Sequence, residues 1–261
     1  MLQSPWRRKI LSKEDERASK PVRAQLPTDP DQIALIEARN GLRQFDAIRE
    51  FVRKSIGHSP FKLRPSDILR LNRVALDGLN PLAGVFRPDE MTIGKSRHNP
   101  PPPDLVPALV EDMCDYVNEN VGEKTPVHLA AYLLWRTNWI HPFDDGNGRT
   151  ARATSYAVLC ICLGYELPGT KTIPEHLAGE KAPYYRALEA ADEAWKKKQT
   201  DVAELEALLE DALAKQLLEV HGGQPARSCK RIRIPQLTEF PLPAASRALY
   251  DVGSCTLCAP T

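Results

Sequence analysis

The apolar residues between positions 31 and 220 recur mostly every three or four residues, which is the spacing of one face of an α-helix. The first such segment follows Asp31, a residue suited to an N-cap, and includes Leu42 and Phe45. Pro126 fits the first position of a later helix, where a missing N–H costs nothing. The pattern therefore predicts an all-α domain over residues 31–220. Its helices are expected to begin near residues 31, 65, 105, 126, 150, 183 and 201.

The stretch from Val85 to Pro103 lacks this spacing, contains Gly94 and ends in four consecutive prolines. These features predict a small β-hairpin flap on the surface. The two ends of the chain also lack the helical spacing of apolar residues. Residues 1–30 are polar with four prolines, and residues 221–261 combine prolines, arginines and isolated apolar residues. We expect a polar N-terminal arm over 1–30, a helical domain over 31–220 and an irregular C-terminal tail over 221–261.

The chain has 261 residues, 42% of them apolar and 26% charged, and its formal net charge is +1. This balance gives no bulk attraction to nucleic acid or to an anionic membrane. A basic cluster in the tail lacks the interleaved aromatic residues typical of nucleic-acid binding; its members are Arg227, Lys230, Arg231 and Arg233. The longest apolar run is far shorter than the roughly 20 residues that span a bilayer. The six cysteines form no disulfide framework, so we expect a cytoplasmic location and no membrane partner.

The segment from residue 141 to residue 152 concentrates groups suited to phosphate chemistry. Gly146-Asn147-Gly148 allows close approach of backbone N–H groups to an anion, and a helix that begins there favours negative charge. Arg149 and Arg152 lie three residues apart and can reach one cluster of phosphate oxygens. Asp145 is a single carboxylate of the kind that holds Mg²⁺ together with substrate phosphates, and His141 can accept a proton near neutral pH. The combination indicates phosphoryl or nucleotidyl transfer.

These twelve residues, HPFDDGNGRTAR, match the Fic signature HxFx(D/E)GNGRxxR at every defined position. The segments Gly84–Arg87 and Pro100–Pro103 also resemble those that bracket the target-docking flap of Fic proteins. The resemblance extends over about residues 31–220. It implies the all-helical Fic core with a β-hairpin flap and an enzyme that transfers AMP from ATP and Mg²⁺ to a Ser, Thr or Tyr hydroxyl of a target protein.

The resemblance also implies roles for individual residues. His141 would be the general base, Asp145 the Mg²⁺ ligand and Phe143 a buried anchor of the loop. The remaining motif residues would contact the phosphates, the three loop residues as an anion cradle and the two arginines as a clamp: Gly146, Asn147, Gly148, Arg149 and Arg152.

Outside the motif the resemblance implies two further contact regions. Met91, Thr92 and Ile93 would line the flap, where an extended target segment could add as a strand. Tyr184 or Tyr185 would flank the adenine, with burial as ordinary core aromatics as the alternative.

Many Fic proteins carry an inhibitory (S/T)xxxE(G/N) helix whose glutamate pairs with the second motif arginine. The nearest candidate is Glu37, which lacks the flanking residues of that pattern and is otherwise a solvated helix acid. Inhibition would then come from Glu37 or from a small inhibitory partner. Two alternatives to AMP transfer remain: an interaction protein of the toxin–antitoxin or regulatory type with a silenced site, and a Fic protein that transfers another phosphate-containing group. A DNA-binding repressor would rest on the tail alone.

Overall fold

The computed structural model describes residues 26–56, 60–94 and 96–220. These residues form eight α-helices, one short 3-10 helix and no strand beyond one isolated bridge, so the predicted all-α class is confirmed. Most of the predicted arm and all of the predicted tail lie outside the described residues, and both stay predictions. The helices are α1 (Pro30–Ile56), α2 (Pro65–Leu76), η2 (Pro103–Leu105), α3 (Val106–Asn120), α4 (Pro126–Ile140), α5 (Asn147–Leu163), α6 (Ile173–Gly179), α7 (Lys181–Lys196) and α8 (Ala203–Val220).

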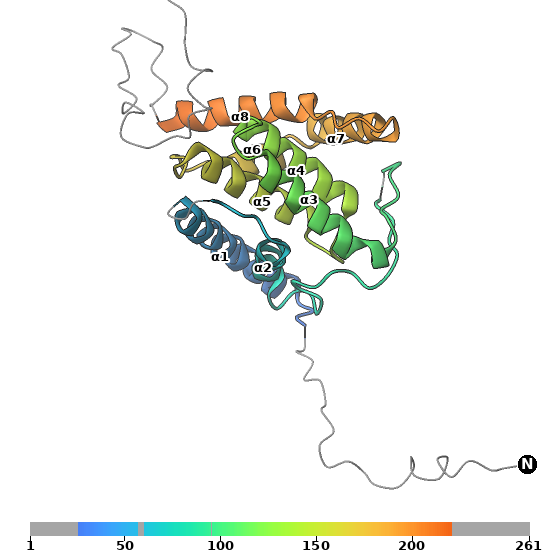
Figure 1. Cartoon of the computed structure of the whole chain (residues 1–261). Coiled ribbons are helices and arrows are strands. Elements are labelled where there is room, and N and C mark those ends of the chain that lie inside the picture. The colour runs from blue at the N-terminus through green and yellow to red at the C-terminus, as the bar shows by residue number, and fades with distance from the viewer. Residues whose placement is uncertain (1–25, 57–59, 95, 221–261) are drawn as a thin grey trace, which may run out of the picture.

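Helices α4 and α5 form the centre of the molecule. Figure 1 shows them between α1 and α2 on one side and α7 and α8 on the other. Most residues of both helices are buried, including small polar residues of α5 such as Thr150, Thr154 and Ser155. Helix α4 begins at Pro126, and the Thr125 side chain accepts a hydrogen bond of 3.0 Å from the N–H of His128. The loop between these two central helices is the predicted motif.

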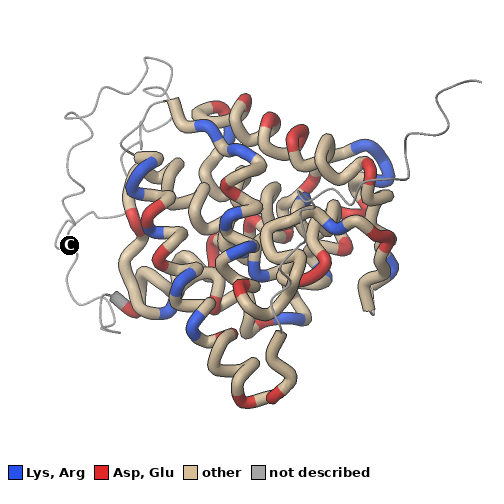
Figure 2. Tube along the Cα trace, turned by 90° about the horizontal axis from the view of Figure 1, so that it is seen from below, with Lys and Arg blue, Asp and Glu red and all other residues tan. Residues whose placement is uncertain are grey.

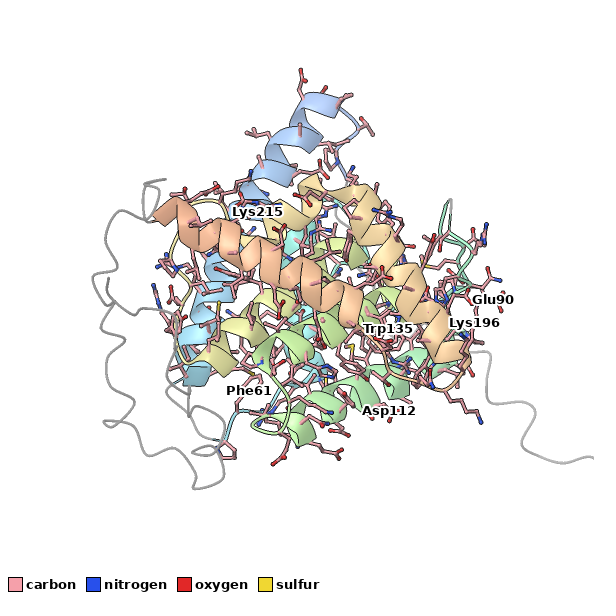
Figure 3. The ribbon with its side chains drawn as sticks, turned by 90° about the horizontal axis from the view of Figure 1, so that it is seen from above. Phe61, Glu90, Asp112, Trp135, Lys196 and Lys215 are labelled. Carbon is pink, nitrogen blue, oxygen red and sulfur yellow. The ribbon has the colours of Figure 1, made fainter. Side chains whose placement is uncertain are left out.

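Helix α1 faces the core with amide side chains. Asn40 is fully buried and donates to the carbonyl oxygen of Asp77 at 2.8 Å, while Gln44 donates to that of Leu71 at 3.1 Å. Leu42 and Phe45, two of the apolar residues that predict this helix, are exposed instead. The Asn40 amide thereby satisfies the carbonyl oxygen of Asp77, at the C-terminal end of α2. In Figure 3 the N-terminal part of α1, in blue at the upper edge, projects beyond the body of the domain.

The last three helices pack together through a buried glutamine of α8. Gln216 is fully buried, accepts a hydrogen bond of 2.8 Å from the N–H of Ile173 at the start of α6, and donates to the hydroxyl of Tyr156 in α5 at 3.2 Å. Helix α6 was not predicted. It begins with a capping box in which Glu175 accepts from the N–H of Thr172 at 2.6 Å.

The predicted β-hairpin flap is not confirmed, since the described residues between 85 and 103 contain a turn at residues 93–96 but no strand pairing. Arg87 organises the segment instead. Its buried guanidinium donates to the carbonyl oxygens of Asp89 and Pro101, which bring the start and the end of the flap together. The proline run at residues 100–103 offers no N–H for a strand ladder, which explains the absence of pairing there.

Positions of Lys and Arg are interspersed with positions of Asp and Glu along the backbone trace in Figure 2, in agreement with the net charge of +1. No helix in the part of the chain that the structure describes is long and apolar enough to cross a membrane.

Candidate active site

His141 ends α4 in a left-handed backbone conformation, with φ 52° and ψ 59°. This conformation is costly for a residue with a side chain, and such strain is typical of functional positions. The Nδ1 atom of His141 lies 3.3 Å from the carbonyl oxygen of Asn138. Since a carbonyl only accepts, Nδ1 carries the hydrogen, and Nε2 is left with the lone pair in the neutral ring.

Burial lowers the pKa of His141 below its ordinary value, and the charges of Arg87 and His98 lower it further. The Asn138 carbonyl and Asp145 act in the opposite direction without reversing the shift. A lowered pKa keeps the ring neutral at pH 7. His141 therefore has the protonation state that a general base needs.

Phe143 and Asn147 hold the loop in place. Phe143 is fully buried and packs near Phe86, with ring centroids 6.0 Å apart, in agreement with its expected role as an anchor. The Asn147 side chain accepts from the N–H of Phe143 at 2.9 Å and donates to its carbonyl oxygen at 2.7 Å. The Asn147 side chain is thus used within the loop, and its backbone N–H is the group that can belong to the predicted anion cradle.

Gly146 has no acceptable substitute in this structure. Its φ is +75°, and an added Cβ would lie 3.1 Å from Leu76 Cδ1 and 3.2 Å from Asn72 Nδ2. Its N–H already donates to the carboxylate of Asp145 at 2.6 Å. The N–H groups that begin α5, at residues 147–149, are the ones that a helix start leaves without helical partners. An anion at this loop would meet these three groups and the positive end of the helix dipole.

Arg149 and Arg152 line a cavity of 560 Å³ between α1, α5 and α6. Arg149 lies 3.5 Å from the Asp145 carboxylate and 3.4 Å from the Glu37 carboxylate. The family pattern pairs the inhibitory glutamate with the second arginine, which here is Arg152, whereas Glu37 contacts the first. Both motif arginines thus border one space large enough for a polyphosphate, and an acid of α1 reaches the first of them.

Asn72 is a residue of this site that the motif did not reveal. It is fully buried in α2 and donates to the carbonyl oxygen of Asp145 at 3.0 Å and to the Thr150 hydroxyl at 3.2 Å. Its own oxygen accepts from the N–H of Gly84 at 2.8 Å. One side chain therefore connects α2, the start of the flap and both ends of the loop. Its only signal in the sequence is an amide on the apolar face of a helix.

Arg87 is the second unpredicted residue. It donates through Nε to the carbonyl oxygen of His141 at 2.8 Å, and its backbone N–H donates to that of Pro142 at 2.9 Å. These two bonds fix the flap to the residue that would act as base.

Five predicted contact residues lie outside the motif. Tyr184 is buried and accepts from the Asn138 amide at 3.0 Å. Burial raises the pKa of Tyr184 to about 12, and Arg152 acts in the opposite direction, so this core aromatic also neighbours the second motif arginine. Tyr185 is 54% exposed, so it is the accessible member of the pair. In the flap, Met91 and Ile93 are half-buried and Thr92 is exposed.

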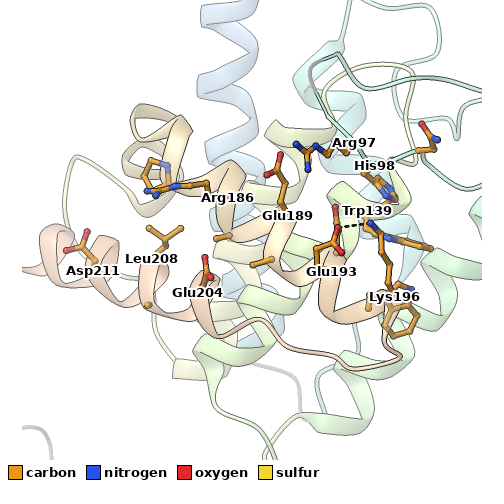
Figure 4. Close-up of a pocket in the computed structure, with 17 residues that line it drawn as sticks. Arg97, His98, Trp139, Arg186, Glu189, Glu193, Lys196, Glu204, Leu208 and Asp211 are labelled. Atoms are coloured by element: carbon orange, nitrogen blue, oxygen red, sulfur yellow. Dashed lines mark hydrogen bonds and ion pairs between the residues drawn. The ribbon is translucent and has the colours of Figure 1, made fainter.

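A second cavity, of 1060 Å³, lies between the end of the flap and helices α7 and α8 (Figure 4). None of the predicted site residues lines it. Its wall includes Trp139, which lies two residues before His141. The carbonyl oxygen of Trp139 is 2.7 Å from His98 Nε2. The cavity and the phosphate loop therefore meet at the C-terminal end of α4.

A metal ion would have few protein ligands here, because the described residues contain no group of three or more His, Cys, Asp and Glu side chains suited to one. The Asp145 carboxylate is 57% exposed beside the helix start. A single exposed carboxylate fits Mg²⁺, which usually keeps several waters and binds through one or two carboxylates and substrate phosphates.

Comparison with known proteins agrees with the resemblance of the motif to the Fic signature. Residues 62–159 match the model of the Fic/DOC family. The protein adenylyltransferase Fic of Drosophila persimilis is 30% identical over 160 residues, which are 60% of this chain and 30% of that protein. The protein adenylyltransferase fic-1 of Caenorhabditis briggsae is 32% identical over 120 residues, or 45% of this chain and 23% of that protein. The chain thus spans less than a third of the length of these relatives.

Solved structures show the same fold at low sequence identity. A Fic family protein from Desulfovibrio desulfuricans has a TM-score of 0.57 at 23% identity, covering 77% of this chain and 57% of its own. A Fic domain containing signaling protein from Bacteroides thetaiotaomicron has a TM-score of 0.59 at 21% identity, covering 74% and 76%. On the motif, the family match and this fold, the chain contains a Fic/DOC family domain.

Proposed function

We propose that this chain transfers AMP from ATP to a Ser, Thr or Tyr hydroxyl of a protein target. The observation that carries the proposal is a neutral histidine, His141, whose unprotonated Nε2 lies at the end of a loop that leads directly into an anion-binding helix start. Relatives that bear the name protein adenylyltransferase share 29–32% of their residues with this chain over the matched region.

The reaction needs one proton acceptor and stabilisation of phosphate charge. His141 Nε2 takes the proton of the target hydroxyl, whose oxygen forms a bond to the α-phosphorus of ATP. The bond from that phosphorus to the bridging oxygen breaks, and pyrophosphate leaves. The N–H groups that begin α5, together with Arg149 and Arg152, stabilise the charge that develops on the phosphate oxygens. Asp145 would hold Mg²⁺, which supplies positive charge to the phosphates when bound.

The target is proposed to dock along Met91, Thr92 and Ile93. The flap that carries them is connected to the base through Arg87, so a segment bound there is held at a fixed place relative to His141. Positioning of this kind contributes to rate because it replaces the search for a reactive geometry.

Glu37 is proposed as a partial brake on this site. Its carboxylate occupies Arg149, which the phosphates would otherwise contact. The pair is partly exposed, at 35% and 50% of the two side chains, so its free energy is at most about 1 kcal/mol. Strong inhibition would therefore need a small inhibitory partner in addition to the contact between Glu37 and Arg149.

Labelled ATP tests which phosphate of the nucleotide is transferred to protein. The full chain is incubated with Mg²⁺, a lysate as the source of targets, and ATP labelled at either the α- or the γ-phosphate. Kinases of the lysate also transfer the γ-phosphate, so label is counted only above that of a parallel reaction with His141→Ala. We expect such label from α-labelled ATP only. Label above the control from γ-labelled ATP would show transfer of a phosphate group and would replace the proposal with the alternative of a Fic protein that transfers another phosphate-containing group.

A further inference from the structure

The outer face of α1 carries a row of mostly apolar side chains, of which the two leucines are the most exposed. Phe45 is partly covered, since the Arg49 guanidinium lies over its ring. Leu35 and Leu42 are each 72% exposed, and Phe45 is 37% exposed. They belong to a row of positions spaced alternately four and three residues apart, which we call the α1 stripe. Its members are Asp31, Leu35, Ala38, Leu42, Phe45 and Arg49.

This spacing is the a/d repeat of a coiled-coil seam, and it continues over 18 residues, about 27 Å of helix. Exposed leucines scattered singly on a surface need no explanation, but a continuous seam of this period indicates a facing helix. The opposite face of α1 already packs on the domain through Asn40 and Gln44. The stripe is therefore an additional surface of the helix.

We propose that the α1 stripe pairs with the same stripe of a second copy of this chain, in antiparallel orientation. The stripe is self-complementary about residue 40. In that orientation Leu35 faces Phe45 of the second copy, and Ala38 faces Leu42. Each layer then combines an a position with a d position and places a larger side chain against a smaller or flat one, as interdigitated packing requires.

The charges at the ends of the stripe decide the orientation. In an antiparallel pair Asp31 faces Arg49 of the second copy at both ends, giving two ion pairs of opposite charge. A parallel pair would place Asp31 against Asp31 and Arg49 against Arg49, and like charges across a helix interface are unfavourable. Arg49 contacts Glu166 of its own chain through Nε, and its guanidinium carries further N–H donors for a second carboxylate.

One pair of helices of this length buries less area than a standard protein interface. We therefore expect an equilibrium between monomer and dimer that depends on protein concentration. The pairing is argued from α1 and not from the proposed AMP transfer, but it adjoins the proposed phosphate site, because Ala38, Leu42 and Phe45 also line the cavity that contains Arg149 and Arg152. The test below measures association and not activity.

Sedimentation of the full chain over a concentration series is expected to show reversible dimerisation. Leu42→Glu should weaken it at least about tenfold, because a charge then lies in the middle of the seam. Since Leu42 is exposed, this substitution leaves the fold intact. Arg43→Gln is the control, a charge change on α1 outside the stripe that loses only a half-exposed ion pair with Asp77, and it should leave association unchanged. A monomer up to about 1 mM, or a dimer insensitive to Leu42→Glu, would overturn the proposal.

Mixing two defective variants tests the orientation. Leu35→Lys and Phe45→Glu should each fail to dimerise alone, with helix content confirmed by circular dichroism. Mixed together they should form a heterodimer, because antiparallel pairing puts Lys against Glu in one layer and Leu against Phe in the other. A mixture that stays monomeric would refute the antiparallel pairing.

Discussion

Arg87 donates a hydrogen bond of 2.8 Å to the carbonyl oxygen of His141, which connects the flap segment to the residue proposed as the base. The same guanidinium donates to the carbonyl oxygens of Asp89 and Pro101. It is 3% exposed, so each lost bond would leave a poorly hydrated carbonyl. The geometry of His141 therefore depends on a residue outside the sequence motif.

Arg87→Lys should keep the positive charge but lose the fork that reaches several carbonyl groups at once. We expect kcat for AMP transfer to fall about 10- to 100-fold, because the base and the flap lose their common support. Steady-state kinetics measure the effect, and thermal unfolding shows whether the variant is folded at the assay temperature. A folded variant with parental kcat would refute a positioning role.

The pH dependence of activity should report the lowered pKa of His141. The neutral ring is the active form, so kcat/KM should decrease as the pH falls through this pKa and protonates Nε2. Because burial and the nearby charges lower the pKa, the midpoint of this acid limb is expected below 6.5, and the profile should be flat through pH 7. A limb centred above 6.5 would contradict the lowered pKa or the assignment of the base.

Asn72→Ala should destabilise the fold and the loop together. The substitution removes two donated hydrogen bonds and leaves the N–H of Gly84 unpaired, which should lower the free energy of unfolding by about 2–3 kcal/mol. Asn80→Ala is the control, since its side chain donates an exposed bond to Asp144 and accepts a partly buried one from the N–H of Leu82, and their loss should cost only about 1 kcal/mol. Urea denaturation measures both, and equal losses would show that Asn72 has no special role.

Glu37→Gln should raise the rate of AMP transfer up to about fivefold, because it removes the carboxylate that occupies Arg149. Glu50→Gln, a charge change on the same helix whose ion pairs with Lys54 and Arg70 lie away from the loop, should have no effect. Parallel rate measurements decide the matter. Equal rates for the Glu37 variant and the parent would exclude Glu37 as a brake.

Much of the fold follows from local sequence signals. Proline at residues 65 and 126 and the apolar periodicity of the central segments predict helix positions that the structure confirms. Helix α6 has only seven residues, too few for a periodic pattern, and depends on its capping box and on contacts with α8. The β-hairpin of the flap is not confirmed, because its proline and glycine content indicates a turn but cannot show whether strands form beside it.

The candidate site likewise contains residues that the sequence predicts and residues that only the fold reveals. The motif predicted the loop, its buried phenylalanine and the neighbouring arginines, because all of them lie within twelve residues. Asn72 and Arg87 reach the loop from 54 to 78 residues away in the chain, and a single sequence holds no record of that proximity. The sequence likewise could not show which arginine Glu37 contacts, because that depends on how the fold brings α1 to Arg149.

The role of His141 is the central claim, and the rate of transfer of α-labelled AMP by His141→Ala tests it most directly. The substitution removes the base but leaves the phosphate contacts, so we expect the rate to fall about 10²- to 10⁴-fold while circular dichroism stays that of the parent. A folded His141→Ala variant that transfers AMP at the parental rate would contradict the account.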